Sequence, residues 1–284
     1  MKQLYKISSK VVPYIPNSIK NSLYKVYLFS ANTLFEKEIN NNPIFILGNH
    51  KAGTTAISML ISQGANLSIA GGLKKERIDP IYRDIYNNNI AFETILKRNK
   101  IDFAKQIIKE NQLTFFYNQI VKHFSNPKFI FMIRDPRDNI RSILNRINVQ
   151  GDLIDASYHD FMKNISISQK LVLDNSWLGI DKEHYIEALA ERWNLAADTF
   201  LQNKDNIVFT KYEDFVKDKV GYISRITRGL GCTLQNNIKD LVDIQYQPKG
   251  NNTISWEDFF GNTNLSRIEE ICKTRMELFD YTLS

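Results

Sequence analysis

The feature that most constrains the fold is the stretch NNPIFILGNHKAGTTAISMLI, which spans residues 41–61. Its apolar run, Ile44 to Leu47, is bounded by turn residues and is typical of a buried parallel strand. After a loop, Ile57, Leu60 and Ile61 recur at the spacing of the inner face of a helix. The stretch therefore predicts a strand, a loop and a helix in direct succession.

The loop between this strand and helix holds the residue types of an anion site, namely Gly48, Lys51, Gly53, Thr54 and Thr55. Backbone N–H groups, the positive end of the helix and one ammonium group would all point into the same space. The alternative is an ordinary strand–turn–helix connection with a surface lysine, because Gly and Thr are common at helix starts.

This loop is not a nucleoside-triphosphate P-loop. That motif reads G-x-x-x-x-G-K-[ST], with the lysine directly after the second glycine. Here Lys51 precedes Gly53, and the position that would need lysine is Thr54. A P-loop-type kinase or nucleotide-binding module that uses ATP and magnesium stays open only as the alternative function.

Composition sets the remaining limits. A chain of 284 residues that is 43% hydrophobic can bury a large core, and we expect one domain over residues 42–284 after a basic helical segment at 1–41. The net charge of +6 and the pI near 9.1 suit an anionic ligand, a nucleic acid or a membrane surface. Nucleic-acid binding would rest on charge alone, so we expect none.

The N-terminus predicts a helix from Ser18 to about Glu38, which either packs on the domain or docks on a membrane surface or partner. No stretch approaches the ~18 apolar residues of a membrane span, and the start of the chain lacks the apolar run of a signal peptide. Cys232 and Cys272 have no metal-binding or redox spacing. We expect a soluble cytoplasmic protein, with contact to the inner face of the membrane as an option for the basic N-terminus.

A second informative stretch reads NPKFIFMIRDPRDNIRSILNRI. Its near-continuous apolar run, Lys128 to Ile133, predicts a central parallel strand. Asp135 followed by Pro136 is a strong helix start, so Arg134 falls at the carboxyl end of the strand, where open α/β sheets bind ligands. Ser142 lies two turns into that helix. The alternative is a surface cluster of ion pairs, which contributes little energy.

The rest of the chain repeats this pattern. Residues 68–70 predict a short strand, and helical patterns fill 80 to about 118. In the stretch NIVFTKYEDFVKDKV, residues 207–210 predict a strand and residues 212–214 a turn. A helix follows, and its apolar face ends at Leu230.

Together these stretches resemble the sulfotransferases that use 3′-phosphoadenosine 5′-phosphosulfate (PAPS). HKAGTT is similar to that family's 5′-phosphosulfate loop, [KR]-x-G-T-T, and RDPRDNIRS to its 3′-phosphate motif, with Arg and Ser eight positions apart. KYEDF resembles its Y-E-D-L segment, and PKG at Pro248 to Gly250 resembles its C-terminal R-K-G element. The matches follow family order over nearly the whole chain after the first helix. The resemblance implies an α/β fold with a central parallel β-sheet flanked by helices, a P-loop-like nucleotide-binding architecture, and PAPS as the sulfate-donor co-substrate.

The resemblance also implies a role for each matching residue. Lys51 would contact the bridging oxygen and the 5′ phosphate, and the loop residues Ala52, Gly53, Thr54 and Thr55 would hold the phosphosulfate. Arg134 and Ser142 would bind the 3′ phosphate, and Tyr212 would approach the adenine. Lys249 and Gly250 would close over the 3′ phosphate from the C-terminal segment. Two positions depart from the family, because Pro248 replaces an arginine and Ala56 replaces a tryptophan that stacks on adenine. Trp193 and Trp256 are candidates for the missing aromatic ring.

Sulfuryl transfer needs no metal, because fixed cations stabilise the leaving oxygen, but the acceptor must lose a proton to a base. We expect that base to be Glu76, since several carbohydrate and protein sulfotransferases resemble this arrangement of a Glu with an Arg close after it, here Arg77. The cytosolic branch of the family uses a histidine, which makes His50 and His123 rivals. Three neighbouring cations, Lys74, Lys75 and Arg77, should lower the pKa of Glu76.

By analogy with the family, residues 71–119 and 148–185 should line the acceptor cleft. They mix charged and amide side chains with six aromatic residues, namely Tyr82, Tyr86, Phe92, Tyr158, Phe161 and Trp177. Such a mixture suits a polar sugar better than a steroid or simple phenol, which would need an apolar box. The sequence therefore predicts a carbohydrate or glycolipid acceptor.

Overall fold

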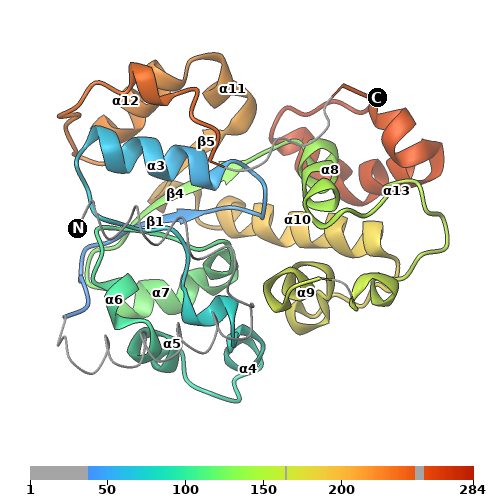
Figure 1. The fold of residues 1–284 in the computed structure, drawn as a ribbon, viewed down its shortest axis with the longest axis horizontal. Coiled ribbons are helices and arrows are strands. Elements are labelled where there is room, and N and C mark those ends of the chain that lie inside the picture. The colour runs from blue at the N-terminus through green and yellow to red at the C-terminus, as the bar shows by residue number, and fades with distance from the viewer. Residues whose placement is uncertain (1–37, 164, 247–252) are drawn as a thin grey trace, which may run out of the picture.

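The computed structural model describes residues 38–163, 165–246 and 253–284. Five strands form one parallel sheet in the order β2-β3-β1-β4-β5 (Figure 1). The strands are β1 (Ile44–Leu47), β2 (Ile69–Ala70), β3 (Ile107–Lys109), β4 (Lys128–Ile133) and β5 (Ile207–Lys211). The predicted parallel sheet is confirmed, and β1 and β4 have the predicted bounds.

Helices connect the strands and cover both faces of the sheet, as the sequence predicted. The α-helices are α3 (Thr54–Gly64), α4 (Tyr82–Tyr86), α5 (Glu93–Arg98), α6 (Lys100–Phe103), α7 (Tyr117–His123), α8 (Pro136–Ile147), α9 (Ile167–Leu173), α10 (Tyr185–Leu201), α11 (Tyr212–Lys217), α12 (Lys219–Gly229) and α13 (Trp256–Leu278). The 3₁₀ turns are η2 (Lys75–Arg77), η3 (Asn111–Phe116), η4 (Tyr158–Phe161), η5 (Ser176–Leu178), η6 (Lys204–Asn206) and η7 (Lys239–Leu241).

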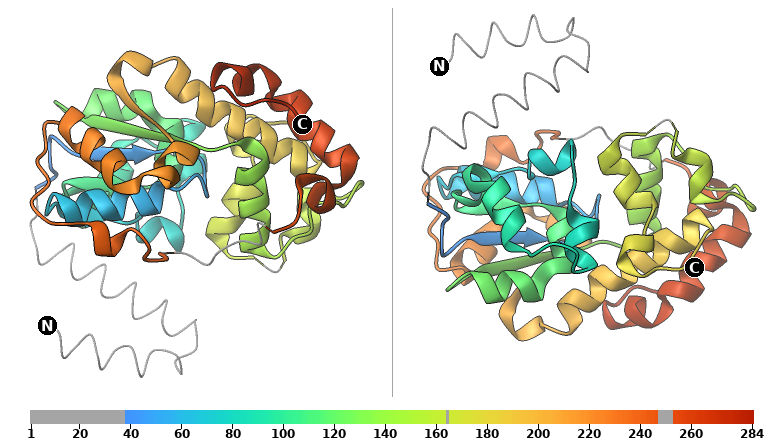
Figure 2. Two further views of the ribbon diagram at one scale, coloured as in Figure 1. Left: turned by 90° about the horizontal axis from the view of Figure 1, so that it is seen from above. Right: turned by 90° about the horizontal axis from the view of Figure 1, so that it is seen from below.

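The two faces of the sheet bury different cores because successive strand residues point to opposite sides. Ile44 and Ile46 of β1 face α3, α11 and α12, whereas Phe45 and Leu47 face the larger core under α7 and α10. The views from above and from below show the helices on the two sides of the sheet (Figure 2). Every residue of β1 is buried, which explains why its sequence is a continuous apolar run rather than an alternating one.

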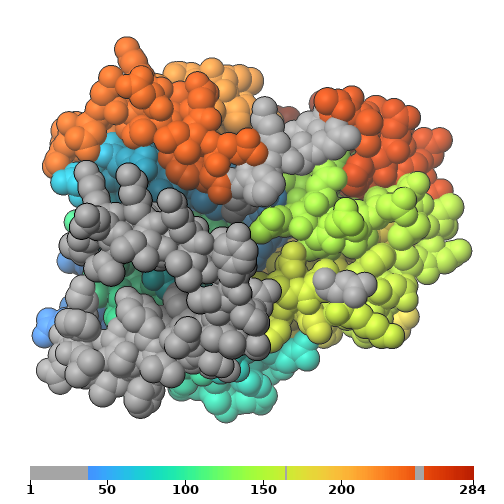
Figure 3. Space-filling view, in the orientation of Figure 1, coloured from blue at the N-terminus to red at the C-terminus, as the bar shows by residue number. Residues whose placement is uncertain are grey.

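A second group of helices lies beyond the carboxyl ends of the strands. In Figure 1, α8, α9 and α13 stand beside the sheet, and α10 extends from beneath the sheet to join them. On the other side, α12 and the segment after it lie against α3, which the space-filling view shows as orange atoms directly over blue ones (Figure 3). The carboxyl edge of the sheet therefore faces the second group of helices, and this is the edge at which open α/β folds bind ligands.

Three predictions fail in the fold. Residues 107–109, expected to be helical, form β3, because they pair with β1 on one side and β2 on the other. The predicted turn at 212–214 is the first turn of α11, since the chain continues in helical geometry after β5. Phe92 and Trp177 do not line a cleft but pack around Phe116 in the core. The predicted N-terminal helix lies outside the described residues.

Candidate active site

The loop after β1 is shaped by backbone conformations that few residues adopt. Gly48 has φ 137°, and a Cβ there would lie 2.4 Å from the carbonyl oxygen of Met132. Lys51 has φ 66° and Gly53 has φ 102°, so a non-glycine residue sits in the left-handed region beside the loop's second glycine. Such strain persists only where the surroundings hold it in place, and it gathers at functional sites.

Asn111 holds this loop and lies in η3, the turn that follows the neighbouring strand β3. Its Nδ2 donates hydrogen bonds to the carbonyl oxygens of Gly48 at 2.7 Å and Asn49 at 3.1 Å. From the same turn, the hydroxyl of Thr114 accepts a hydrogen bond from the backbone N–H of Gly48 at 2.9 Å. The loop carbonyls are thus satisfied from behind, which leaves the opposite side of the loop for a ligand.

The first turn of α3 faces that side. No described side chain caps the helix, and its first turn contains no acidic residue. The first backbone N–H groups of a helix have no partner within the helix, and the helix dipole makes this end positive. This is the geometry in which helices bind phosphate and sulfate groups.

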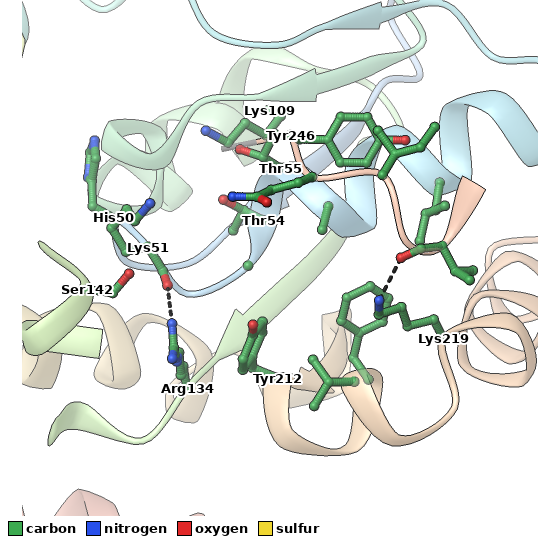
Figure 4. Close-up of a pocket in the computed structure, with 18 of the residues that line it drawn as sticks. His50, Lys51, Thr54, Thr55, Lys109, Arg134, Ser142, Tyr212, Lys219 and Tyr246 are labelled. Carbon is green, nitrogen blue, oxygen red and sulfur yellow. Dashed lines mark hydrogen bonds between the residues drawn. The ribbon is translucent and has the colours of Figure 1, made fainter. Parts of the chain in front are cut away.

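A cavity of about 500 Å³ opens in front of the loop (Figure 4). We call it the large cavity. It brings together most of the predicted nucleotide-binding residues, namely Lys51, Gly53, Thr54, Thr55, Arg134, Ser142 and Tyr212. Ala52 is buried in the core behind the loop, so its side chain does not line the cavity. Lys249 and Gly250 lie outside the described residues.

Arg134 is held at the end of β4 by three contacts. Its guanidinium lies 4.5 Å from the ring centroid of Tyr212, and its Nη1 donates to the carbonyl oxygen of Lys51 at 3.3 Å. Its Nη2 lies 3.6 Å from a carboxylate oxygen of Asp138. Its buried Nε has no hydrogen-bond partner among the described residues. A buried donor without a partner is costly, so this atom is available to an anionic ligand.

Lys51 is surrounded by cations. Burial first, and then the positive charges of Arg146, Arg134 and Lys109, lower the pKa of Lys51 to about 8. The ammonium form is therefore disfavoured in the empty site relative to a lysine in water. An anionic ligand would reverse this effect, so binding a phosphate or sulfate at Lys51 is coupled to its protonation.

The two tryptophans proposed as adenine contacts do not reach the large cavity. Trp193 is buried in the core and donates its Nε1–H to the carbonyl oxygen of Arg134. Trp256 lies over the guanidinium of Arg137. The aromatic rings that line the cavity are instead Tyr212, Phe215 and Tyr246. Phe215 closes the KYEDF segment, but the resemblance implied a role only for Tyr212 there, and Tyr246 lies outside every motif.

A smaller cavity of about 110 Å³ adjoins the large one, and we call it the small cavity. Its lining is mostly polar and consists of His50, Glu76, Arg77, Tyr82, Lys109, Glu110, Asn111, Gln112, Ser168 and Leu171. Three of these residues, His50, Lys109 and Asn111, also line the large cavity. Lys109 and Asn111 were missed in the sequence because β3 was read as part of a helix.

Glu76 lies on the wall of the small cavity. The residue is 2% exposed, and its carboxylate already accepts hydrogen bonds from the protein. It accepts hydrogen bonds from Asn99 Nδ2 at 2.8 Å, Arg98 Nε at 3.2 Å and Ile81 N at 3.0 Å. The expectation that adjacent cations lower its pKa is wrong, because burial outweighs all of these contacts and raises the pKa of Glu76. The side chain of Arg77 instead donates to the carbonyl oxygen of Gly71.

His50 lies between the two cavities. Its Nδ1 is out of contact with solvent and has no partner among the described residues. Burial, followed by the charges of Arg192, Lys109 and Lys51, holds the pKa of His50 well below its ordinary value. The other histidine candidate, His123, pairs with Glu93 at 2.7 Å and lines neither cavity. The imidazole of His50 is therefore neutral and has an unused nitrogen.

Two further observations concern the described residues only. No group of three or more His, Cys, Asp or Glu side chains gathers there as a metal site. Across residues 38–163, 165–246 and 253–284, each helix is too short or too polar to cross a lipid bilayer.

A protein-family model described as "Sulfotransferase domain" matches residues 41–254 and so spans all five strands. Among solved structures, the sulfotransferase domain from the curacin biosynthetic pathway is 14% identical, with a TM-score of 0.48, over 86% of this chain and 99% of that one. A sulfotransferase from Alicyclobacillus acidocaldarius is 14% identical, with a TM-score of 0.46, over 83% and 97%. Mouse sulfotransferase SULT7A1, complexed with PAP, is 17% identical, with a TM-score of 0.48, over 89% of each chain. No curated protein matches the sequence.

Proposed function

The chain belongs to the sulfotransferase domain family of PAPS-dependent transferases, and we propose that it transfers the sulfuryl group of PAPS to a hydroxyl or amine of a carbohydrate or glycolipid. The observation that carries the donor assignment is the large cavity. It joins the 5′-phosphosulfate loop, with Lys51 and Thr55, to the 3′-phosphate pair, Arg134 and Ser142. These residues come from two strand ends, and only a ligand with two separate anionic groups uses both.

In this proposal the two phosphate subsites work differently. The backbone N–H groups at the start of α3 and the hydroxyls of Thr54 and Thr55 hold the 5′-phosphosulfate. The unpartnered Nε of Arg134 and the hydroxyl of Ser142 bind the 3′ phosphate. Lys249 and Gly250 stay predictions for the closing contact.

We place the adenine against Tyr246 and Phe215. Both rings line the large cavity together with Ala56, at the position where related enzymes carry a tryptophan. The small side chain of Ala56 leaves space there, and the ring of Tyr246, in the segment after η7, can fill it. Tyr212 is already stacked on Arg134 and packed against Gly53, so it positions the phosphate site beside the adenine.

The transfer itself is a displacement at sulfur. A lone pair of the acceptor oxygen or nitrogen forms the new bond to sulfur, and the bond from sulfur to the oxygen of the 5′ phosphate breaks. PAP leaves with that electron pair, and the acceptor proton goes to a base. Lys51 and the helix N–H groups stabilise the charge that develops on the leaving oxygen, which accelerates the step because this charge is largest in the transition state.

We propose that the small cavity receives the acceptor. It adjoins the large cavity through His50, Lys109 and Asn111, so an acceptor there faces the sulfuryl group. Apart from Leu171 and the ring of Tyr82, its lining is polar or charged. The buried hydroxyl of Tyr82 has no partner among the described residues and is ready to bond a polar substrate. These features support a hydroxyl-rich acceptor over a steroid or simple phenol.

Two residues compete for the role of base, as the sequence suggested. Both oxygens of Glu76 accept hydrogen bonds within the protein, whereas Nδ1 of His50 accepts none. This difference favours His50. Its low pKa in the free enzyme makes it a weak base, but the negative charge of bound PAPS beside it offsets the cations and restores basicity. Glu76 remains the alternative.

A thermal-shift experiment distinguishes the sulfotransferase from the alternative function, a kinase or nucleotide-binding module that uses ATP and magnesium. PAP should raise the midpoint, by an amount that corresponds to about 2.7 kcal/mol at a ligand concentration 100 times its Kd. ATP with magnesium should not, and AMP, which lacks the 3′ phosphate, should do so only weakly. A larger shift with ATP and magnesium than with PAP would reject the sulfotransferase assignment. Mass spectrometry after incubation with PAPS and a panel of glycans would then test the acceptor class.

A further inference from the structure

Arg192, in α10, is a charged side chain in an unusual environment. It is 0% exposed, and it forms no ion pair with any described carboxylate. Burial lowers its pKa to about 9, so it is still a cation at neutral pH. The charge of Glu110 favours the cation without touching it. A buried charge with no carboxylate in direct contact is expensive, and hydrogen bonds to neutral acceptors offset that cost.

Four oxygen atoms provide that environment. Nε donates to Asn49 Oδ1 at 3.1 Å, and Nη2 donates to Gln112 Oε1 at 2.7 Å. Nη1 donates to Asn175 Oδ1 at 2.8 Å and to the carbonyl oxygen of Leu171 at 3.3 Å. All three nitrogens of the planar guanidinium are therefore engaged, and a lysine, with a single nitrogen, cannot reproduce this pattern.

Three of the four acceptors, all but Asn175, belong to segments that also form the small cavity. Asn49 precedes His50 in the loop after β1, and Gln112 lies beside Asn111 in η3. Leu171 lies in α9, which contributes Ser168 to the same wall. One guanidinium thus joins three segments that are far apart in the sequence and meet around a single cavity.

The contact with Asn49 extends to the backbone of His50. Oδ1 of Asn49 accepts the bond from Arg192 and also one from the backbone N–H of His50, at 2.9 Å. Nδ2 of Asn49 donates to Asn139 Oδ1 at 2.9 Å, and Nδ2 of Asn139 donates to the carbonyl oxygen of His50 at 2.7 Å. Both peptide groups that flank the side chain of His50 are therefore fixed through one chain of hydrogen bonds.

We propose that Arg192 is a positioning residue for sulfuryl transfer, which fixes the loop that carries His50 and Lys51 relative to the walls of the small cavity. The inference rests on the proposed function, because it takes the small cavity as the acceptor site. Arg192 lines neither cavity, so in this proposal it acts only through Asn49, Gln112 and α9. Misplacing a reacting group by about 1 Å can cost about 100-fold in rate, so hydrogen bonds that hold His50 in place have a large effect on turnover.

The charge of Arg192 has a second effect at the same place. The charged groups that surround His50 are Lys51 in its own loop, Lys109 at the end of β3, Glu110 directly after it, Glu76 and Arg77 in η2, and Arg192. Among these, Arg192 contributes most to keeping the imidazole neutral. Removal of its charge should therefore let His50 titrate at a higher pH, whereas a lysine in its place should not.

Two substitutions separate charge from geometry, and NMR of the full chain labelled with ¹⁵N-histidine reads both. Only four histidines are present, and His50→Asn assigns the resonance of interest. In Arg192→Met we expect the imidazole of His50 to titrate at a higher pH than in the wild type. In Arg192→Lys we expect a titration close to the wild type but shifted imidazole resonances, because the charge is kept and the hydrogen bonds to Asn49 and Gln112 are not both made.

Turnover provides the second readout, measured as PAP released from PAPS with water as the acceptor. Arg192→Lys should lower kcat by about 100-fold and leave the Kd for PAP within about twofold. Arg275→Met is the matched control, since Arg275 pairs with Asp198 of α10 at a distance from both cavities. It should lose thermal stability but keep the His50 spectrum and kcat.

The inference is overturned if Arg192→Lys keeps both the wild-type spectrum of His50 and the wild-type kcat, and this variant decides the matter if Arg192→Met does not fold. A fall in kcat in Arg192→Lys that Arg275→Met matches would also overturn it, since the effect would then be general loss of stability. Failure of the wild-type protein to bind PAP would instead reject the proposed function. The NMR comparison would still report whether Arg192 fixes His50.

Discussion

The guanidinium of Arg134 lies 4.5 Å from the ring centroid of Tyr212, and the same ring covers Gly53, where an added Cβ would lie 2.5 Å from it. One aromatic ring therefore touches both Arg134, the proposed 3′-phosphate residue, and the proposed phosphosulfate loop. Gly53 is needed for its left-handed backbone and also because no side chain fits beneath this ring. The ring of Tyr212 thus couples the two proposed anion subsites.

This coupling predicts that Tyr212→Ala weakens PAP binding although the side chain carries no charge. A cation–π contact of this kind contributes about 0.5–2 kcal/mol, so the Kd for PAP should rise about 2- to 30-fold. Tyr212→Phe keeps the ring and should bind PAP within about twofold of the wild type. Isothermal titration calorimetry provides both values, and equal losses in the two variants would show that the hydroxyl, not the ring, matters.

Arg134→Met should abolish the preference for a 3′-phosphorylated nucleotide. A hydrogen bond to a charged group contributes about 1.5–3 kcal/mol, so the Kd for PAP should rise about 10- to 150-fold. AMP lacks the 3′ phosphate and serves as the internal control, because its Kd should change little. If the affinities for PAP and AMP fall together, Arg134 supports the whole cavity rather than one phosphate.

Much of the proposed donor site could be predicted from sequence because it depends on local patterns. The apolar runs 44–47 and 128–133 are long enough to identify central strands, and Asp135 caps α8 as its sequence indicates, accepting a hydrogen bond from the backbone N–H of Arg137. Arg134 and Ser142 then follow from the positions of a strand end and a helix face. No contact distant in sequence is needed to place them.

The acceptor side depends on distant contacts and could not be predicted in the same way. β3 has three residues, and only pairing with β1 and β2 makes it a strand, so Lys109 was not recognised at a strand end. The environment of Glu76 is set by Arg98 and Asn99, more than twenty positions away. Arg192 reaches Asn49 across 143 positions. Such partners leave no periodicity or local motif in the sequence.

Lys51 should limit activity at alkaline pH. Its folded pKa of about 8 is below the ordinary value, so in the free enzyme the ammonium is present below pH 8 and is lost as the pH rises through it. The kcat/KM for PAPS should therefore decline above about pH 8. Lys51→Arg stays charged throughout this range and should remove the decline, at a lower overall rate. Persistence of the decline in that variant would assign it to another group, such as Lys109.

Lys51→Ala tests the same residue at neutral pH. Removal of a group that stabilises the leaving oxygen should cost about 2.7–4 kcal/mol in the transition state, or about 10²- to 10³-fold in kcat. The fold should be intact, because the side chain belongs to a loop at the edge of the large cavity. Circular dichroism and thermal unfolding provide that control, and near-wild-type turnover in a folded variant would contradict the role.

The identity of the base follows from a comparison of His50→Asn with Glu76→Gln. If His50 accepts the proton, His50→Asn should slow PAPS turnover by about 10²- to 10⁴-fold with little change in the Kd for PAP. Glu76→Gln keeps the shape of the side chain and, in that case, should retain most of the activity while losing some stability. Its carboxylate accepts bonds from Arg98, Asn99 and the backbone of Ile81, and a Gln amide can accept only part of them.

The pH dependence separates the two candidates further. Burial raises the pKa of Glu76 and lowers that of His50, so the acid limb of kcat/KM alone does not identify the group. The acid limb of kcat/KM must disappear in the variant that lacks the base and persist in the variant of the other candidate. An inactive Glu76→Gln protein that binds PAP normally, beside an active His50→Asn protein, would assign the proton to Glu76 and make the unpartnered Nδ1 of His50 a contact for the acceptor instead.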